Sequence, residues 1–265
     1  MILLSFDTEE FDMPLEYGKQ ISFDEQMSIS IKGTNSILEI LDKHQIKATF
    51  FCTATFALHA KEITKKIASN GHEIASHGYH HSQFENAHLL ESKLILEKLT
   101  QTEVIGFRMA RMQPVDNDAI KQADYLYNSS INPTYLPGRY NHFRKPRTFF
   151  KEQELIQIPA SVSPIIRFPL FWLSFHNLPL KLYTWISKLT HNKDSYLNIY
   201  FHPWEFTDLH KTHLGMPPYV KRNSGAKMIE RMDKFITHFK NQNYTFGTFK
   251  DFLESQNLTP ITLSK

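Results

Sequence analysis

The sequence predicts an α/β fold in which parallel strands alternate with helices. Short apolar runs rich in β-branched and aromatic residues recur along the chain, and several are followed by segments with helical periodicity. The polar residues best suited to chemistry stand directly after these apolar runs. Because barrels built from β/α units carry their active sites at the carboxyl ends of the strands, this placement favours such an architecture.

The first strand is expected over residues 1–6, an apolar run that ends just before Asp7 and Glu9. No basic segment or small-residue cleavage site precedes these carboxylates, so we expect a strand there and not a signal peptide. Four strand–helix pairs are expected to follow. They are 47–53 with 55–69, 72–76 with 87–99, 104–107 with 116–123, and 197–201 with 221–240.

No linker, repeat or low-complexity tract divides the chain, so one domain spanning 1–265 is predicted. The least regular part is about 132–190, where seven prolines interrupt regular elements. Proline cannot continue the hydrogen-bond pattern of a helix or a central strand. An irregular insertion folded over one face of the domain is therefore expected there.

Composition excludes several classes of protein. The 265 residues are 41% hydrophobic and 22% charged, enough for a substantial core, and the net charge of +3 comes from dispersed cations that give no support for nucleic-acid binding. The single cysteine, Cys52, lies in an apolar run and is expected to be a buried hydrophobe. No apolar run is long enough to span a bilayer, and we expect a cytoplasmic protein.

Two histidines four residues apart, His77 and His81, directly follow an apolar run and could hold one metal ion. With one carboxylate they would form a three-ligand site that leaves a position for water. Asp7 and Glu9 alternate along an extended chain and would point to the same side, so one could bind metal while the other accepts a proton. His80 could replace His81, and the histidines could instead belong to a solvated loop.

Four segments resemble motifs of a known family. Ser5–Glu9 (SFDTE), Ser76–His81 (SHGYHH), Gly106–Arg108 (GFR) and Phe201–Glu205 (FHPWE) are similar, in this order, to the polysaccharide deacetylases of the NodB-homology group, also called carbohydrate esterase family 4. The resemblance spans most of the chain. It implies a distorted (β/α) barrel of about seven parallel strands. The implied activity is metal-dependent removal of an N-acetyl or N-formyl group from an amino sugar of a bacterial surface glycan or its precursor.

The resemblance also implies a role for each of six residues. It suggests Asp7 as catalytic base, Arg108 as the residue that orients it, His202 as general acid, and Glu9, His77 and His81 as ligands of a divalent cation, expected to be Zn²⁺. These residue types suit amide hydrolysis. A bound cation makes water nucleophilic near neutral pH, a carboxylate can accept the proton of that water, and an imidazole can protonate the departing amine.

Three positions depart from the family pattern. Ala110 stands where a proline is common, Asn128 where an aspartate often tunes the acid histidine, and Glu9 where aspartate is the commoner ligand. The turn after Arg108, the pKa of His202 and the metal occupancy are therefore open at this stage. Arg108 could also be an ion-pair partner of Asp116 or Asp124, and His202 part of a turn that packs Trp204.

Two further classes of function stay open. One is another C–N hydrolase on the same scaffold, such as an allantoinase-like enzyme, and the other is a catalytically impaired glycan-binding relative. The segment 164–189 is aromatic and apolar with interspersed cations. It could form two short helices that cap the barrel, or a peripheral membrane contact at the inner face, with Trp172 and Phe175 at the surface and a lipid-linked sugar as substrate. The oligomeric state does not follow from the sequence.

Overall fold

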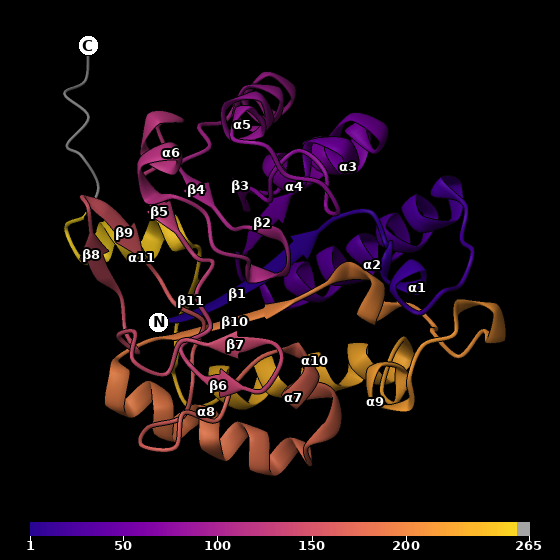
Figure 1. Ribbon diagram of the computed structural model, residues 1–265. Helices are drawn as coiled ribbons and strands as arrows, with labels where there is room; N and C mark the ends of the chain where they lie inside the picture. Colours follow the sequence, from indigo (N-terminus) through magenta and orange to yellow (C-terminus); the bar gives the residue numbers. More distant parts are fainter. Residues whose placement is uncertain (259–265) are drawn as a thin grey trace.

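A curled sheet of mostly parallel strands forms the centre of the protein, seen in a computed structural model that describes residues 1–258, and helices cover its outside (Figure 1). The strands lie in the order β10 (Leu197–Phe201), β1 (Ile2–Thr8), β2 (Thr49–Cys52), β3 (Glu73–Ser76), β4 (Gly106–Phe107), β5 (Tyr127–Asn128), β9 (Leu155–Gln157) and β8 (Phe150–Glu152).

The seven strands from β10 to β9 are parallel, whereas β8 pairs with β9 in the antiparallel sense. A further short strand, β11 (Phe246–Gly247), pairs with the start of β1. The predicted distorted (β/α) barrel of about seven parallel strands is thus confirmed. The predicted strand at 1–6 is too short, because β1 continues through Asp7 to Thr8.

The two ends of the parallel array, β9 and β10, meet without a paired-strand ladder. Asn198 in β10 connects them instead. Its carbonyl accepts a hydrogen bond from Ser161 N (2.9 Å), and its side-chain Nδ2 donates to the carbonyl oxygens of Ile158 (3.2 Å) and Pro159 (3.0 Å). The sheet is therefore a half-barrel whose open side is bridged by hydrogen bonds of the Asn198 backbone and side chain.

The helices that follow the strands agree with the predicted alternation, with three differences in detail. The segment predicted as one helix over 55–69 is divided at Ala60, whose backbone (φ −122°, ψ 47°) is not helical, and the long helix α2 was not predicted. The helix predicted over 221–240 begins only at Ala226, because Gly225 before it has a positive φ of 67°. The described helices are α1 (Met13–Glu16), α2 (Phe23–His44), α3 (Ala54–His59), α4 (Lys61–Ser69), α5 (Ala87–Thr100), α6 (Asn117–Gln122), α7 (Trp172–Asn177), α8 (Leu180–Asp194), α9 (Pro218–Lys221), α10 (Ala226–Lys240) and α11 (Phe249–Ser255).

The segment 132–190 holds several different elements. It contains the hairpin of β6 (Tyr135–Leu136) and β7 (Tyr140–Asn141), then β8 and β9, and ends within α8. Because β9 pairs with β5, part of this segment builds the barrel, while α7 and α8 contact β10. None of the described helices has the length and apolar character needed to span a bilayer.

The amino end of the barrel is filled by packed aromatic rings. Phe249 at the start of α11 contacts Phe51 (ring centroids 5.4 Å apart) and stacks on Tyr127 (5.2 Å). The buried Glu73 accepts hydrogen bonds from Tyr127 Oη (2.8 Å) and Thr49 Oγ1 (2.7 Å), and its burial raises its pKa. With this end closed, a site open to solvent can form only at the carboxyl ends of the strands.

Candidate active site

Residues at the carboxyl ends of three strands surround a cavity of about 340 Å³. Asp7 is the second-last residue of β1, and Glu9 directly follows that strand. His77 follows β3, and His202 follows β10. All four side chains line the cavity, so the sequence positions chosen as candidates come together in space.

Glu9, His77 and His81 form a compact cluster on one wall. Glu9 Oε2 lies 3.1 Å from His77 Nε2 and 3.2 Å from His81 Nε2, and one ligand atom from each residue lies within 4.8 Å of the others. These side chains are nearly or fully buried. His80, the alternative ligand, lies outside this cluster and bonds Thr55 Oγ1 through Nδ1 (2.7 Å).

The Nδ1 atoms of His77 and His81 contact groups outside the cluster. His77 Nδ1 lies 2.8 Å from the carbonyl oxygen of Arg108, which can only accept, so Nδ1 carries the proton and Nε2 presents a lone pair to Glu9. His81 Nδ1 lies 2.7 Å from Asp12 Oδ1. A carbonyl or carboxylate behind the imidazole is the usual arrangement around a metal ligand, since it fixes the ring and its tautomer.

The electrostatics of this cluster favour a bound cation. Burial alone would raise the pKa of Glu9, but the nearby histidines, His81 first, lower it to about 2. Burial would lower the pKa of His81, whereas Glu9 and Asp12 raise it to about 9. A buried carboxylate facing two imidazole nitrogens therefore holds a positive charge between them, which either a proton or a metal ion can supply.

Asp7 is held by a guanidinium behind it. Arg108 is fully buried, and its Nη1 donates to Asp7 Oδ1 at 2.6 Å and to Ser5 Oγ at 3.0 Å. Its other nitrogens donate to the carbonyl (3.2 Å) and hydroxyl (3.0 Å) oxygens of Ser129, and its Cζ lies 3.9 Å from the ring centre of Phe51. Arg108 is thus the partner of Asp7, whereas the Asp124 carboxylate lies beside Lys93.

His202 also lines the cavity, with Nε2 at 4.0 Å from Asp7 Oδ2. Its Nδ1 lies 2.9 Å from Glu205 Oε1, and Glu205 Oε2 lies 2.8 Å from His176 Nε2. Burial alone would lower the pKa of His202, but the hydrogen bond with Glu205 and the charges of Glu9 and Asp7 raise it. The carboxylate that tunes His202 therefore comes from its own motif.

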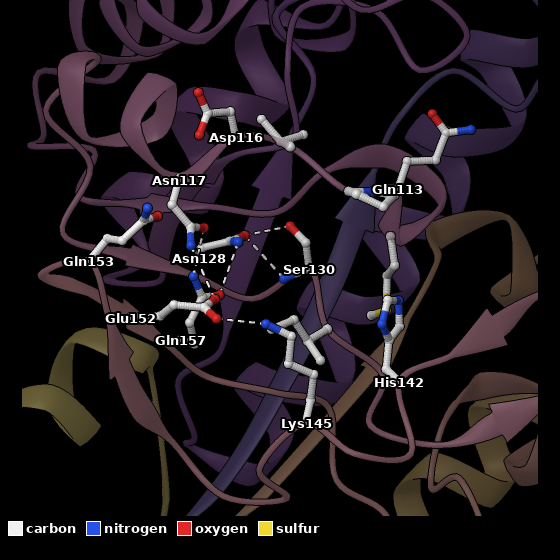
Figure 2. Close-up of a pocket in the computed structure, with 14 residues that line it drawn as sticks. Gln113, Asp116, Asn117, Asn128, Ser130, His142, Lys145, Glu152, Gln153 and Gln157 are labelled. Carbon is white, nitrogen blue, oxygen red and sulfur yellow. Dashed lines mark hydrogen bonds and ion pairs between the residues drawn. The ribbon is translucent and has the colours of Figure 1, made fainter.

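Asn128, expected near His202, lies elsewhere. Figure 2 shows its side chain in a neighbouring cleft, where Nδ2 donates to Gln157 Oε1 (3.1 Å) and Oδ1 accepts from the amide of Ser130 (3.1 Å). Ala110 begins a 3₁₀ turn whose next two residues, Arg111 and Met112, have positive φ angles of 54° and 51°. The concern that Asn128 deprives His202 of a carboxylate does not apply, because Glu205 supplies one.

A family model described as polysaccharide deacetylase matches residues 20–125, a segment that contains His77, His81 and Arg108. Over this segment the chain is similar to the polysaccharide deacetylases, as its motifs predict. The match contains two of the four motifs and does not extend to Asp7, Glu9 or His202.

Curated relatives in this family match short segments. The chain is 41% identical over 66 residues to the uncharacterized protein YlxY of Bacillus subtilis (strain 168), covering 25% of this chain and 20% of that protein. It is 35% identical over 48 residues to the peptidoglycan-N-acetylmuramic acid deacetylase PdaA of the same organism, covering 18% of each. The matched segments thus span about a fifth of the length of each of these relatives.

Solved structures of polysaccharide deacetylase type share the fold over nearly the whole chain. A Mycobacterium smegmatis protein assigned to the polysaccharide deacetylases aligns with a TM-score of 0.66 at 18% identity, covering 100% of this chain and 93% of that one. The PuuE allantoinase aligns at 0.61 and 16%, covering 91% and 84%. BA3943, a family 4 pseudoenzyme from Bacillus anthracis, aligns at 0.55 and 15%, covering 96% and 65%.

Three residues of this candidate site were not identified from the sequence. Asp12 lies in the same acidic run as Glu9, and its spacing could have marked it as a partner of His81. Glu205 lies in the HPWE motif three residues after His202, a spacing that allows contact in a tight turn. His176 is 26 residues before His202 in the chain, and no local pattern connects the two.

Proposed function

We propose that the protein is a divalent-metal-dependent hydrolase that removes an N-acetyl or N-formyl group from an amino sugar of a bacterial surface glycan or its precursor. The observation that carries this proposal is the cluster of Glu9, His77 and His81, flanked on one side by the Asp7–Arg108 pair and on the other by His202. A carboxylate, two imidazoles, a base and an acid around one cavity are the parts that amide hydrolysis requires.

The donor set fits a catalytic metal site. Two imidazole nitrogens and one carboxylate oxygen converge, and each imidazole is oriented from behind, by the Arg108 carbonyl or by Asp12. A divalent cation held there would polarise the amide carbonyl and lower the pKa of water. This donor set suits Zn²⁺, which commonly takes imidazole and carboxylate ligands.

The other residues of the cavity would manage protons and orientation. Asp7, kept in place by Arg108, would accept the proton of the attacking water. His202, whose pKa is raised, would keep its proton to higher pH than a free imidazole and could give it to the nitrogen that leaves. Base and acid line the same cavity, with His202 Nε2 at 4.0 Å from Asp7 Oδ2, so one group can accept a proton and the other can deliver one within the same space.

A glycan substrate is supported by the aromatic lining of the cavity. Trp172, Tyr140 and Tyr200 line it together with the charged residues, and flat apolar surfaces suit the faces of sugar rings. The relative PdaA is described as acting on a sugar of peptidoglycan. An allantoinase-like activity and a glycan-binding protein without turnover remain the alternatives, and both have counterparts among the structures of similar fold.

Metal content and acyl release test the proposal together. Elemental analysis of purified protein should give one divalent ion per chain, and His77→Ala should lose it, while the exposed His210→Ala keeps it. Acetate release from N-acetylglucosamine oligomers should disappear with a chelator and in Asp7→Asn. Activity that survives chelation would refute metal dependence. Turnover of small ureides alone would favour an allantoinase-like enzyme. If no product is released from any substrate, a binding protein is favoured.

We also propose peripheral membrane contact through one face of α8, which would bring the protein to lipid-linked substrates at the inner face of the membrane. Leu182, Trp185 and Leu189 are spaced along one side of this helix and are 42–59% exposed. Lys181 and Lys188 lie beside them. An apolar stripe with an aromatic residue and adjacent lysines is typical of helices that lie on anionic membranes.

The residues that report on this contact differ from those expected from the sequence. Trp172 and Phe175 are buried, so their replacement would disturb the core instead of a surface. Sedimentation with vesicles that contain anionic lipid should fall in Trp185→Ser/Leu189→Ser and persist in Leu94→Ser, which removes an equally exposed leucine from α5. Equal sedimentation of both variants and the native protein would refute the contact.

A further inference from the structure

One arginine that lines the catalytic cavity has no acidic partner. The cavity has two arginines in its wall, Arg111 and Arg139. Arg111 Nη2 lies 2.7 Å from Glu16 Oε1 and 3.5 Å from Asp12 Oδ2, so carboxylates already neutralise its charge. Arg139 is exposed to solvent, and among residues 1–258 no carboxylate lies within ion-pair distance of it. Its positive charge is therefore available to a ligand.

A tight turn fixes the backbone of Arg139. The residue follows Pro137 and Gly138 in the connection between β6 and β7, and its amide donates to the carbonyl oxygen of Leu136 (3.0 Å). Gly138 has a positive φ of 75°, which a turn with proline at its second position commonly requires at its third. Leu136 pairs with Tyr140 across the hairpin. The local sequence thus places Arg139 at the cavity.

The guanidinium of Arg139 is held by only one of its nitrogens. Its Nε donates to Tyr140 Oη (3.1 Å), and Tyr140 Oη lies 3.5 Å from Tyr200 Oη. Both tyrosines line the cavity together with Asp7. Within the described part of the chain, Nη1 and Nη2 of Arg139 make no hydrogen bond. Four N–H donors of an oriented cation therefore remain free.

These donors suit an anion with two oxygens. Paired N–H groups of a guanidinium match the geometry of a carboxylate or a phosphate, and such charge-assisted bonds are stronger than bonds to a neutral hydroxyl group. Asp7 lines the same cavity, whose volume is about 340 Å³. Because the space is small, an anion at Arg139 would lie close to the amide that Asp7 helps to cleave.

We infer that Arg139 recognises an anionic substituent, a carboxylate or a phosphate, on the amino sugar whose acyl group is removed. This inference rests on the proposed function and specifies its substrate as an acidic sugar. Arg139 would contact the substrate and determine specificity without taking part in bond cleavage. Its loss should therefore weaken the binding of acidic sugars and leave the binding of neutral sugars unchanged.

Calorimetry on chelator-treated protein tests the inference without turnover, and removal of any metal ensures that an anion cannot bind there instead. The probes are N-acetylglucosamine, N-acetylmuramic acid, which adds a carboxylate, and N-acetylglucosamine 1-phosphate. The native protein should bind one or both acidic sugars about tenfold more tightly than the neutral sugar. The sugar that is preferred identifies the anion. If this is N-acetylmuramic acid, its methyl ester should bind like N-acetylglucosamine.

Three variants connect the preference to one side chain. Arg139→Gln removes the charge and should bring the ratio of affinities close to one. Arg139→Lys keeps the charge without the paired N–H groups and should retain part of the preference. Arg222→Gln is the matched control, because it removes an exposed arginine that does not line the cavity, and it should keep the native ratio.

Equal affinity for neutral and acidic sugars, no measurable binding of any probe, or a preference that survives in Arg139→Gln would overturn the inference. Failure of the proposed function gives a different result: the native protein shows the preference and Arg139→Gln loses it, but no acetate is released from any of these sugars. Acetate release together with equal affinities would leave the proposed function intact and reject the role of Arg139.

Discussion

Glu205 is a fully buried carboxylate shared by two imidazoles, and the protonation of His176 decides what this carboxylate can do. His176 Nε2 lies 2.8 Å from Glu205, while its Nδ1 is buried and has no hydrogen-bond partner among residues 1–258. A proton on Nδ1 would leave a buried donor unsatisfied, so the favoured tautomer is neutral and donates from Nε2. Glu205 thus keeps its negative charge available for His202.

Glu205→Gln should therefore make His202 a less effective proton donor in the proposed reaction. Loss of the negative charge lowers the pKa of His202, so a smaller fraction is protonated at pH 7, and we expect kcat to fall roughly 10- to 100-fold. The loss should be smaller at lower pH, where His202 regains its proton. The measurement is the pH dependence of kcat, with the exposed Glu39→Gln as control. An unchanged pH profile with normal folding would contradict the role of Glu205.

The candidate residues that could be predicted are those that lie within short sequence motifs. Asp7, Glu9, His77 and His202 stand at strand ends inside short motifs, and the structure brings them around one cavity. His176 could not be found in this way, because its contact with Glu205 depends on how α7 packs against β10. Residues that position others come from any part of the chain that the fold brings close.

At the level of elements, α2 supports the turn that carries His202. It packs against the short 3₁₀ helix at Pro203–Phe206, and Gly33 is at the point of contact. A Cβ atom on Gly33 would lie 1.8 Å from the carbonyl oxygen of Pro203. The glycine allows the backbone of the helix to touch the HPWE turn directly.

For Gly33→Ala, helix propensity and packing predict opposite changes in stability. Propensity alone favours alanine by about 1 kcal/mol in a helix interior. The clash with Pro203 should outweigh this, because overpacking a rigid contact costs about 1–3 kcal/mol, so we expect a net loss of stability and a displaced His202. Urea unfolding measures the first effect, and kcat the second.

Ser28→Ala is the control for Gly33→Ala, since Ser28 is exposed on the same helix and its replacement tests propensity without a clash. It should leave the stability unchanged or slightly raised. If Gly33→Ala stabilised the protein to the same degree as Ser28→Ala, the contact with Pro203 would not restrict this position.

The strand–helix alternation could be predicted because each element has its own apolar period, and β10 begins and ends where expected. The division between α3 and α4 was not predicted, since Phe56, Ile63 and Ile67 keep a common period across Ala60 although its backbone leaves the helical region. β4 and β5 are only two residues long. Their places in the sheet depend on pairing with neighbours and not on local pattern.

For the whole molecule, the arrangement of polar groups divides the barrel into two ends. At the amino end, Glu73 and His72 lie among aromatic rings. At the carboxyl end lie the cavity of the candidate active site and the neighbouring cleft that contains Asn128. The order of the strands and the bridging of β9 to β10 by Asn198 could not be predicted from the sequence, because both join distant parts of the chain.

The amino end should make the stability of the protein sensitive to acid. Burial first, and the charge of Lys47 second, lower the pKa of His72 to about 4, and its Nδ1 accepts a hydrogen bond from the Ala48 amide (3.3 Å). Between pH 6.5 and about 4 the unfolded chain binds a proton at His72 that the folded chain does not. The free energy of unfolding therefore falls as pH drops through this window, by up to about 3 kcal/mol from this residue.

His72→Gln removes the titrating group, so its free energy of unfolding should fall less than that of the native protein between pH 7 and pH 5, by about 2 kcal/mol. Urea unfolding with a chelator present measures both slopes while keeping the metal ligands in one state. His191, whose pKa is also lowered, contributes equally to both proteins and cancels in the comparison. The exposed His210→Gln should retain the native slope. Equal slopes for His72→Gln and the native protein would mean that His72 can be protonated in the folded barrel, and that its contact with the Ala48 amide does not hold it neutral.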